Sequence, residues 1–168
     1  MNTRKNILLT SALVWVFAAG VAPAEEREAI HASAPVPYVT GLNNPRGLKF
    51  GPDGDLYIAE GGVGSPASAP VTSCPNGVVP FGIGPYRGST TGSRILKVNR
   101  WGQVSTFLDN IPSSQTSDAS GALVSGVADI AFIGRTLYAV LAGAGCSHGV
   151  PGIPNGVIRA NRDHTWTM

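Results

Sequence analysis

The acidic pair Asp53-x-Asp55, followed by Glu60, has residue types that can act as ligands of a metal ion. Carboxylates so close in sequence can hold a hard metal ion such as Ca²⁺. However, Asp53 stands in the segment GPDG (51–54), where Asp-Gly favours a tight turn. No further ligand follows at the spacing of a calcium loop. The turn accounts for Asp53, so we predict no metal site.

The pattern Cys146-x-His148 offers two of the ligands that a zinc site needs. The other histidines, His31 and His164, lie far away in the sequence, so a disulfide or solvent contact explains these groups better. Ser125 stands in LVSG and lacks the flanking glycines of a hydrolase nucleophile turn. These patterns therefore indicate neither a zinc site nor a catalytic serine.

The glycine-rich stretches 82–88 and 143–149 superficially resemble a dinucleotide-binding fingerprint. Neither stretch has the third glycine at the required spacing, and neither opens a helix within a β-α-β unit. Flexible loops explain these glycines, and we predict no cofactor.

Two segments repeat the same order of short apolar strands and turns, and these strands must position any site. The first copy comprises PRGLKFGPDGDLYIAE (45–60) and SRILKVNRWGQVSTFLDNI (93–111), and the second comprises VADIAFIGRTLYAVLAG (127–143) and NGVIRANRDHTWTM (155–168). Recurrence in fixed order is typical of repeat architectures, and four strands per unit indicate a propeller blade. We therefore predict an all-β propeller fold with about two blades, the second incomplete.

The connections between the predicted strands are unequal in length. In blade one (about 43–111) the residues 61–92 form a long insertion rich in Gly, Pro, Ser and Thr, and in blade two (about 121–168) the residues 143–154 form a shorter one in the same place. Long loops without strands of their own are commonly functional surfaces. The segment SSQTSDAS (113–120) is expected to be a polar linker between the blades.

Arg46 and Asp129 stand at or just before the first strand of each repeat, where propeller residues face the axial channel. They are candidate ligand-binding residues of the channel, although turn capping or a mutual ion pair would also explain them. Trp101 and Trp166 lie in corresponding hairpins, and we expect both to pack between blades.

The only two cysteines, Cys74 and Cys146, each lie between the second and third strands of their repeat. Adjacent blades display equivalent loops on one face, so the two residues can meet and form a disulfide. A bridge across a loop of this length contributes on the order of 4 kcal/mol through lost chain entropy in the unfolded state. Two unpaired thiols, or partners outside this chain, are the alternatives.

The first two dozen residues have the character of a secretory signal. Arg4 and Lys5 precede the apolar stretch 7–21, and Ala22-Pro-Ala24 supplies small residues for cleavage between Ala24 and Glu25. The apolar stretch is shorter than the roughly 20 residues that span a membrane. We therefore predict a signal peptide (1–24), a leader (25–35) and an exported domain (36–168), periplasmic or extracellular, with membrane contact only before cleavage.

Composition limits the partners of the exported part. Removing Arg4 and Lys5 with the signal leaves equal numbers of basic and acidic residues, and no basic stripe with interleaved aromatic residues remains. This argues against nucleic acid as a partner. The hydrophobic content of 43% is too high for disorder, and no helical periodicity follows the signal.

The chain resembles the ScyD/ScyE family, exported propeller proteins named for the scytonemin biosynthesis cluster. The resemblance covers residues 36–168 and rests on GLNNPRGLKFGPDGDLYIAEGG (41–62), GPYRGSTTGSRILKV (84–98) and GVADIAFIGRTLYAVLAG (126–143). It implies NHL-like blades, about six in a complete propeller. The family offers no catalytic residues to transfer to this chain, which departs from it by stopping after two blades.

The predicted function is that of an exported binding or accessory protein, because no triad, complete metal set or phosphate loop is present. The alternative is a propeller enzyme, a lactonase-like hydrolase or a quinoprotein-like dehydrogenase, with its ligands spread over several blades. We expect an unidentified ligand or protein partner to contact the insertions 61–92 and 143–154. Two blades leave apolar faces open, so we expect a fragment of a longer product or a chain that associates.

Overall fold

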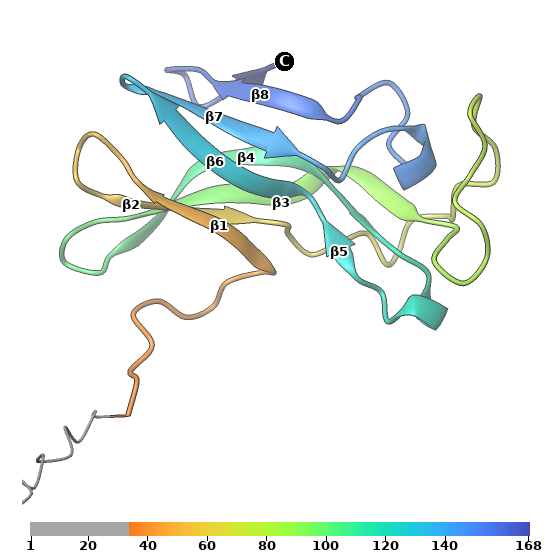
Figure 1. Ribbon diagram of the computed structural model, residues 1–168, viewed down its shortest axis with the longest axis horizontal. Coiled ribbons are helices and arrows are strands. Elements are labelled where there is room, and N and C mark those ends of the chain that lie inside the picture. Colours follow the sequence, from red (N-terminus) through yellow and green to blue (C-terminus); the bar gives the residue numbers. More distant parts are fainter. Residues whose placement is uncertain (1–33) are drawn as a thin grey trace, which may run out of the picture. The chain divides into compact units, whose positions relative to one another are not determined.

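The computed structural model describes residues 34–168, which contain nine strands and two short 3-10 helices (Figure 1). The strands form two separate antiparallel sheets, which confirms the predicted all-β class. The predicted signal peptide and its cleavage position between Ala24 and Glu25 lie outside the described residues.

The first sheet is a meander in which each strand pairs with the next one along the chain. Its strands are β1 (Pro45–Phe50), β2 (Leu56–Glu60), β3 (Arg87–Val98), β4 (Val104–Gln115) and β5 (Val124–Ser125). The turn between β1 and β2 is closed by a hydrogen bond from the Gly51 N–H to the Asp55 carbonyl oxygen (2.8 Å), and Gly54 takes a φ of 81°. A positive φ favours glycine, as expected for this turn.

The second sheet repeats the meander, with shorter third and fourth strands. It contains β6 (Val127–Ile133), β7 (Thr136–Leu141), β8 (Gly156–Ala160) and β9 (Trp166–Thr167). The 3-10 helices η1 (Asp118–Ser120) and η2 (Cys146–His148) lie in the connections before β5 and before β8. The register aligns Tyr138 with Arg159, as it aligns Tyr57 with Lys97 in the first sheet.

Two sequence expectations about the connections are wrong. The insertion 61–92 is not strand-free, because β3 begins at Arg87. The segment 113–120 is not a plain linker, because Ser113 to Gln115 belong to β4 and are buried, and 118–120 form η1. Strand β5 also joins the first sheet rather than the second. The polar side chains in β4 hydrogen-bond to the insertion, which a local sequence pattern does not reveal.

The main core lies between the two sheets. From the first sheet it takes Tyr57, Ala59, Ile95, Leu108 and Ile111, and from the second sheet and its loops Val127, Ile130, Leu137, Ala139, Leu141, Ala144, Val150 and Ile158. The ring of Tyr57 meets Phe107 and Phe132 edge-on, with centroids 5.0 Å and 4.9 Å apart. Such aromatic pairs add to the stabilisation from buried apolar area.

The two tryptophans have different environments. Trp166 packs against the core and donates a hydrogen bond from Nε1 to the Asn110 carbonyl oxygen of β4 (3.1 Å), so it joins the two sheets as expected. Trp101 does not: its side chain is 69% exposed and stacks on the Arg100 guanidinium, 4.2 Å from the ring centroid. Within residues 34–168, no second sheet covers Trp101, so the prediction that it packs between blades is wrong for this part of the chain.

Equivalent residues of the two sheets face the same way along the stack. Tyr57 of β2 faces the second sheet, whereas its counterpart Tyr138 of β7 lies on the face turned away from the first sheet, beside Val140 and Val157. Conversely, Leu137 of β7 is buried between the sheets, whereas its counterpart Leu56 lies on the outer face of the first sheet. The sheets therefore stack head to tail and not as mirror partners.

Head-to-tail stacking leaves two unlike outer faces. On the first sheet, Leu56, Ile58, Leu96 and Val98 pack against Val39 and Leu42 of the preceding segment, while Leu48 and Phe50 of β1 stay exposed. On the second sheet, Ile133, Val140 and Val157 are exposed. Both outer faces thus present apolar residues to solvent.

Candidate functional site

The long loops gather at one end of the two sheets. The connections 61–86, 116–123 and 142–155 all leave or enter strands at this end, where β1 also begins (Figure 1). Alternating strand direction explains the arrangement, because every second connection of a meander falls on the same side. We call this end the insertion end, and the opposite end, with the tight turns of both sheets, the turn end.

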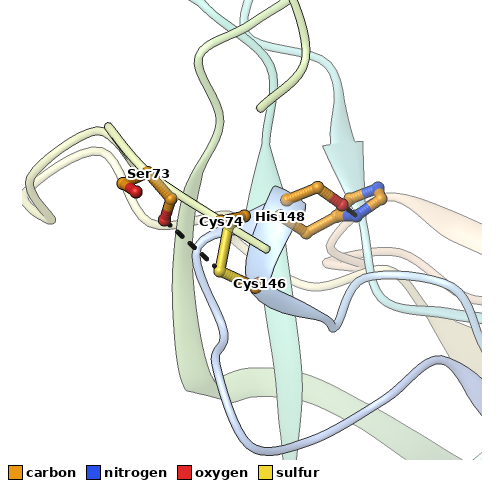
Figure 2. The surroundings of a disulfide bond; sticks show 5 residues. Ser73, Cys74, Cys146 and His148 are labelled. Carbon is orange, nitrogen blue, oxygen red and sulfur yellow. Dashed lines mark hydrogen bonds between the residues drawn. A yellow bond between two sulfur atoms is a disulfide. The ribbon is translucent and has the colours of Figure 1, made fainter. Parts of the chain in front are cut away.

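A disulfide joins the two insertions, between Cys74 of the first and Cys146 of the second (Figure 2). The Cα atoms are 5.8 Å apart, within the usual range for a disulfide. Sγ of Cys146 also lies 3.5 Å from the Ser73 carbonyl oxygen. This is a packing contact, since a disulfide sulfur carries no proton to donate. The two insertions therefore form one covalently linked surface.

His148 lies in the same 3-10 helix as Cys146, beside the disulfide (Figure 2). Its ring packs against Tyr86 with centroids 4.5 Å apart, and its Nδ1 lies 3.4 Å from the Ser147 hydroxyl. Burial lowers the pKa of His148 below its ordinary value of 6.5. A Cβ on Gly88 would lie 2.1 Å from the His148 carbonyl oxygen, so only glycine permits this close approach. The histidine packs at this junction, and among residues 34–168 it belongs to no group of three His, Cys, Asp or Glu that could hold a metal ion.

The first part of the long insertion is fixed to β4 by buried polar groups. The Ser113 hydroxyl donates to the Gly61 carbonyl oxygen (2.8 Å) and accepts from the Gly64 N–H (3.1 Å). Oε1 of Gln115 accepts from the Ser65 N–H (3.0 Å). Buried hydrogen bonds of this kind hold a loop in one conformation. Residues 61–65 are therefore part of the rigid scaffold.

The outer part of the insertion presents apolar side chains to solvent. Phe81 is 90% exposed, and Ile83 and Leu123 are also exposed. The Ser117 N–H donates to the Ile83 carbonyl oxygen (2.9 Å), and the Ser120 hydroxyl bonds to the Gly82 carbonyl oxygen, which holds this tip on η1. We call Phe81, Ile83 and Leu123 the apolar tip. None of these three residues was predicted from the sequence, although isolated apolar residues in a Gly/Pro-rich insertion are a usable signal.

The candidate residues Arg46 and Asp129 lie on the adjacent first strands of the two sheets, and both are exposed. A Cβ on Gly47 would lie 2.3 Å from Oδ1 of Asp129, which shows how closely β1 approaches β6. The two charges form no ion pair within the described residues. Nη2 of Arg46 donates instead to the Val124 carbonyl oxygen of β5, and Oδ1 of Asp129 accepts from the Ile130 N–H (2.8 Å).

Asp53 and Asp55 already have a cation between them. Nζ of Lys97 lies 2.7 Å from Oδ2 of Asp53 and 3.0 Å from Oδ2 of Asp55, and the Tyr57 hydroxyl donates to Asp53 (2.9 Å). Burial raises the pKa of Asp53, but the hydrogen bonds from Lys97 and Tyr57 outweigh it, so the pKa lies below 3.8. The pKa of Lys97 is raised, chiefly by its bonds to the two carboxylates. Lys97 therefore forms ion pairs with both carboxylates.

Glu60, the third residue of that acidic pattern, lies at the opposite end of β2 and is fully buried. Oε1 accepts from the Asn43 N–H (2.7 Å), and Oε2 forms an ion pair with Nε of Arg94. Its role is therefore structural: it fixes the segment before β1 to β2 and β3. The structure does not bring Glu60 together with Asp53 and Asp55.

Over residues 34–168, no three His, Cys, Asp or Glu side chains are placed to share a metal ion. The same part of the chain contains no helix with the length and apolar character that a membrane crossing requires. Comparison with protein-family models, with curated proteins and with solved structures finds no match to this chain.

Proposed function

We propose that this chain is an exported binding or accessory protein built from propeller blades, as its resemblance to the ScyD/ScyE family implies. The ligand or partner contacts the insertion end. The observation that carries the proposal is the covalent junction of the two insertions at Cys74 and Cys146, beside an exposed apolar tip. Adaptable loops fixed on a rigid β scaffold are where binding residues concentrate.

The head-to-tail stacking of the sheets supports the propeller arrangement. Each blade of a propeller is related to the next by the same rotation, so equivalent faces always point the same way. The equivalent residues Tyr57 and Tyr138 face the same direction along the stack, and so do Leu56 and Leu137, as this rule requires. A face-to-face sandwich would instead bury equivalent residues of both sheets against one another. Further sheets can stack on either outer face.

An exported, oxidising location agrees with the disulfide and with the signal-like residues 1–24. The apolar tip favours a ligand with an aromatic or aliphatic portion, because exposed apolar side chains on ordered loops supply binding energy when they are covered. The Asp53, Asp55 and Lys97 cluster lies at the turn end and takes no part in this surface.

Thermal-shift screening of the purified protein against small aromatic compounds and oligosaccharides tests the binding role. We expect hits whose stabilisation is lost in the double variant Phe81→Ala/Ile83→Ala. Trp101→Ala is the control, since it removes another exposed aromatic side chain, at the turn end, and should leave the hits unchanged.

The same preparation is assayed for lactone hydrolysis and for dye-linked dehydrogenation with and without Ca²⁺. Metal-dependent turnover would replace the binding role with an enzymatic one. Hits that persist in the double variant would remove the apolar tip from the proposed surface.

A further inference from the structure

A cavity of about 360 Å³ lies at the turn end of the second sheet, away from the insertions. Residues in and beside the β6–β7 and β8–β9 turns line it, together with Phe107 of the first sheet. The residues from the second sheet are Arg135, Thr136, Leu137, Arg159, Ala160, Asn161, Arg162 and His164. A cavity of this size accommodates a small molecule.

Three arginines, Arg135, Arg159 and Arg162, are among the described residues that line this cavity, and no Asp or Glu is among them. None of the ion pairs formed within residues 34–168 involves Arg135, Arg159 or Arg162. The nearest acid in the turn, Asp163, accepts hydrogen bonds from the N–H and hydroxyl of Thr165 (3.1 Å and 2.6 Å). Within the described residues, none of the three arginines is therefore paired with a carboxylate.

The ring of His164 is anchored to the other sheet. Its Nδ1 lies 2.9 Å from the Phe107 carbonyl oxygen, which can only accept, so Nδ1 carries a proton and donates. His164 also adopts a φ of 61°, a conformation that is uncommon for a residue with a side chain. The turn that carries Arg162 is thus held against β4 of the first sheet.

The first sheet provides an internal comparison. At its turn end, a cavity of about 550 Å³ is lined in part by equivalent residues, with Lys97 in the place of Arg159 and Arg100 in the place of Arg162. There, Asp53 and Asp55 neutralise Lys97. In the second sheet Thr136 replaces Asp55, and the shorter turn puts Arg135 where the first sheet has Asp53-Gly54. At equivalent positions, the second sheet therefore has an arginine and a threonine where the first sheet has two aspartates.

We propose that the turn end of the second sheet is an anion-binding site, in which Arg135, Arg159 and Arg162 hold a phosphate or sulfate group of a small ligand. Guanidinium groups donate paired hydrogen bonds to such oxyanions, and several of them around one cavity match a doubly charged group. This site lies at the opposite end from the proposed insertion surface, so either can fail without the other.

Titration calorimetry of the full chain with inorganic phosphate, and separately with sulfate, tests the site at two ionic strengths, each held constant with chloride. We expect saturable binding that weakens as salt is added. The tighter of the two anions identifies the group. Arg159→Gln should weaken binding roughly tenfold to a hundredfold, the range for a lost charge-assisted hydrogen bond.

Two further variants make the result specific. Thr136→Asp restores the acid of the first sheet beside Arg159, so we expect it to abolish phosphate and sulfate binding while every arginine remains. Arg100→Gln removes the equivalent arginine of the first sheet and should bind as the wild type does. Circular dichroism and thermal melting establish that each variant is folded. Absence of saturable binding by the wild type, or equal losses in Arg159→Gln and Arg100→Gln, would overturn the proposal.

Discussion

At the residue scale, Glu60 is the charge most deeply placed in the described part of the chain. Its carboxylate is fully buried, and it binds the Asn43 N–H and the Arg94 guanidinium. A buried carboxylate is tolerated only when its oxygens are satisfied in this way. Removing it leaves a buried N–H and a half-buried guanidinium without their partner.

We therefore expect Glu60→Ala to lower the free energy of unfolding by about 3 kcal/mol, as for other broken buried pairs. Urea denaturation of the wild type and the variant measures this. Asp118→Asn is the control, because Asp118 forms an exposed ion pair with Arg87 (3.7 Å) and its loss should cost less than about 1 kcal/mol. Equal losses in the two variants would contradict the structural role of Glu60.

The Asp53–Lys97 pair predicts a pH dependence of stability. The pKa of Asp53 is lowered in the folded state, so the folded chain binds this proton more weakly than the unfolded chain does. Its contribution is fully present above the ordinary value of 3.8 and is lost as the pH falls from there through the folded pKa.

The free energy of unfolding, measured against pH for the wild type and Asp53→Asn, isolates this contribution from other carboxylates. We expect Asp53→Asn to be the less stable protein at pH 6 and the difference to shrink steadily below pH 3.8. A difference that stays constant across this range would mean that Asp53 is not stabilised as a carboxylate.

At the scale of elements, the two insertions depend on different restraints. Residues 61–65 are held by the buried side chains of Ser113 and Gln115, whereas the outer part is held by the disulfide, by η1 and by the packing of Tyr86 on His148. The β2–β3 and β3–β4 ladders do not need the disulfide, because they form within one sheet.

The double variant Cys74→Ala/Cys146→Ala should therefore keep both sheets but lose stability. The bridge spans 72 residues, so the loss should approach 4 kcal/mol on the chain-entropy argument. Hydrogen exchange is expected to accelerate in residues 66–86 much more than in β2 and β3. The wild type under reducing conditions serves as the comparison. Uniform acceleration over both sheets would show that the disulfide holds the sheets together.

At the scale of the whole molecule, the consequential feature is the pair of unlike apolar outer faces. Phe50 on the first sheet is 69% exposed, and Val157 on the second is 57% exposed. Exposed apolar sheet faces favour association, and head-to-tail stacking lets the outer face of one copy receive the other outer face of the next.

Sedimentation velocity should accordingly show association of the chain that increases with concentration. Phe50→Lys and Val157→Lys each place a charge on one face and should reduce it. Phe81→Lys changes an exposed apolar residue at the insertion end and should leave association unchanged. Association that is reduced only by Phe81→Lys would assign the contact to the insertions instead.

Much of the fold could be predicted from local patterns. Alternating apolar residues around GPDG (51–54) and the repeat of Leu56-Tyr57 as Leu137-Tyr138 were enough to predict two antiparallel sheets. These features are local because a hairpin is specified by its turn and by the period-two side-chain pattern. Neither needs knowledge of distant contacts.

The environments of the candidate site residues could be known only from the tertiary structure, and the reason differs from residue to residue. Ser113 appeared to belong to a linker because its polar side chain is satisfied only by a loop about 50 residues away in sequence. Trp101 and Trp166 occupy similar hairpins, yet only Trp166 has a neighbouring sheet to pack against. Arg46 donates a hydrogen bond to the Val124 carbonyl oxygen of β5, a contact that the sequence does not predict. The absence of an ion pair at Arg159, within the described residues, becomes informative only when Arg159 is compared with Lys97, which pairs with Asp53. Side-chain pattern specifies strands and turns, whereas long-range contacts decide which polar groups are satisfied and which remain free to bind.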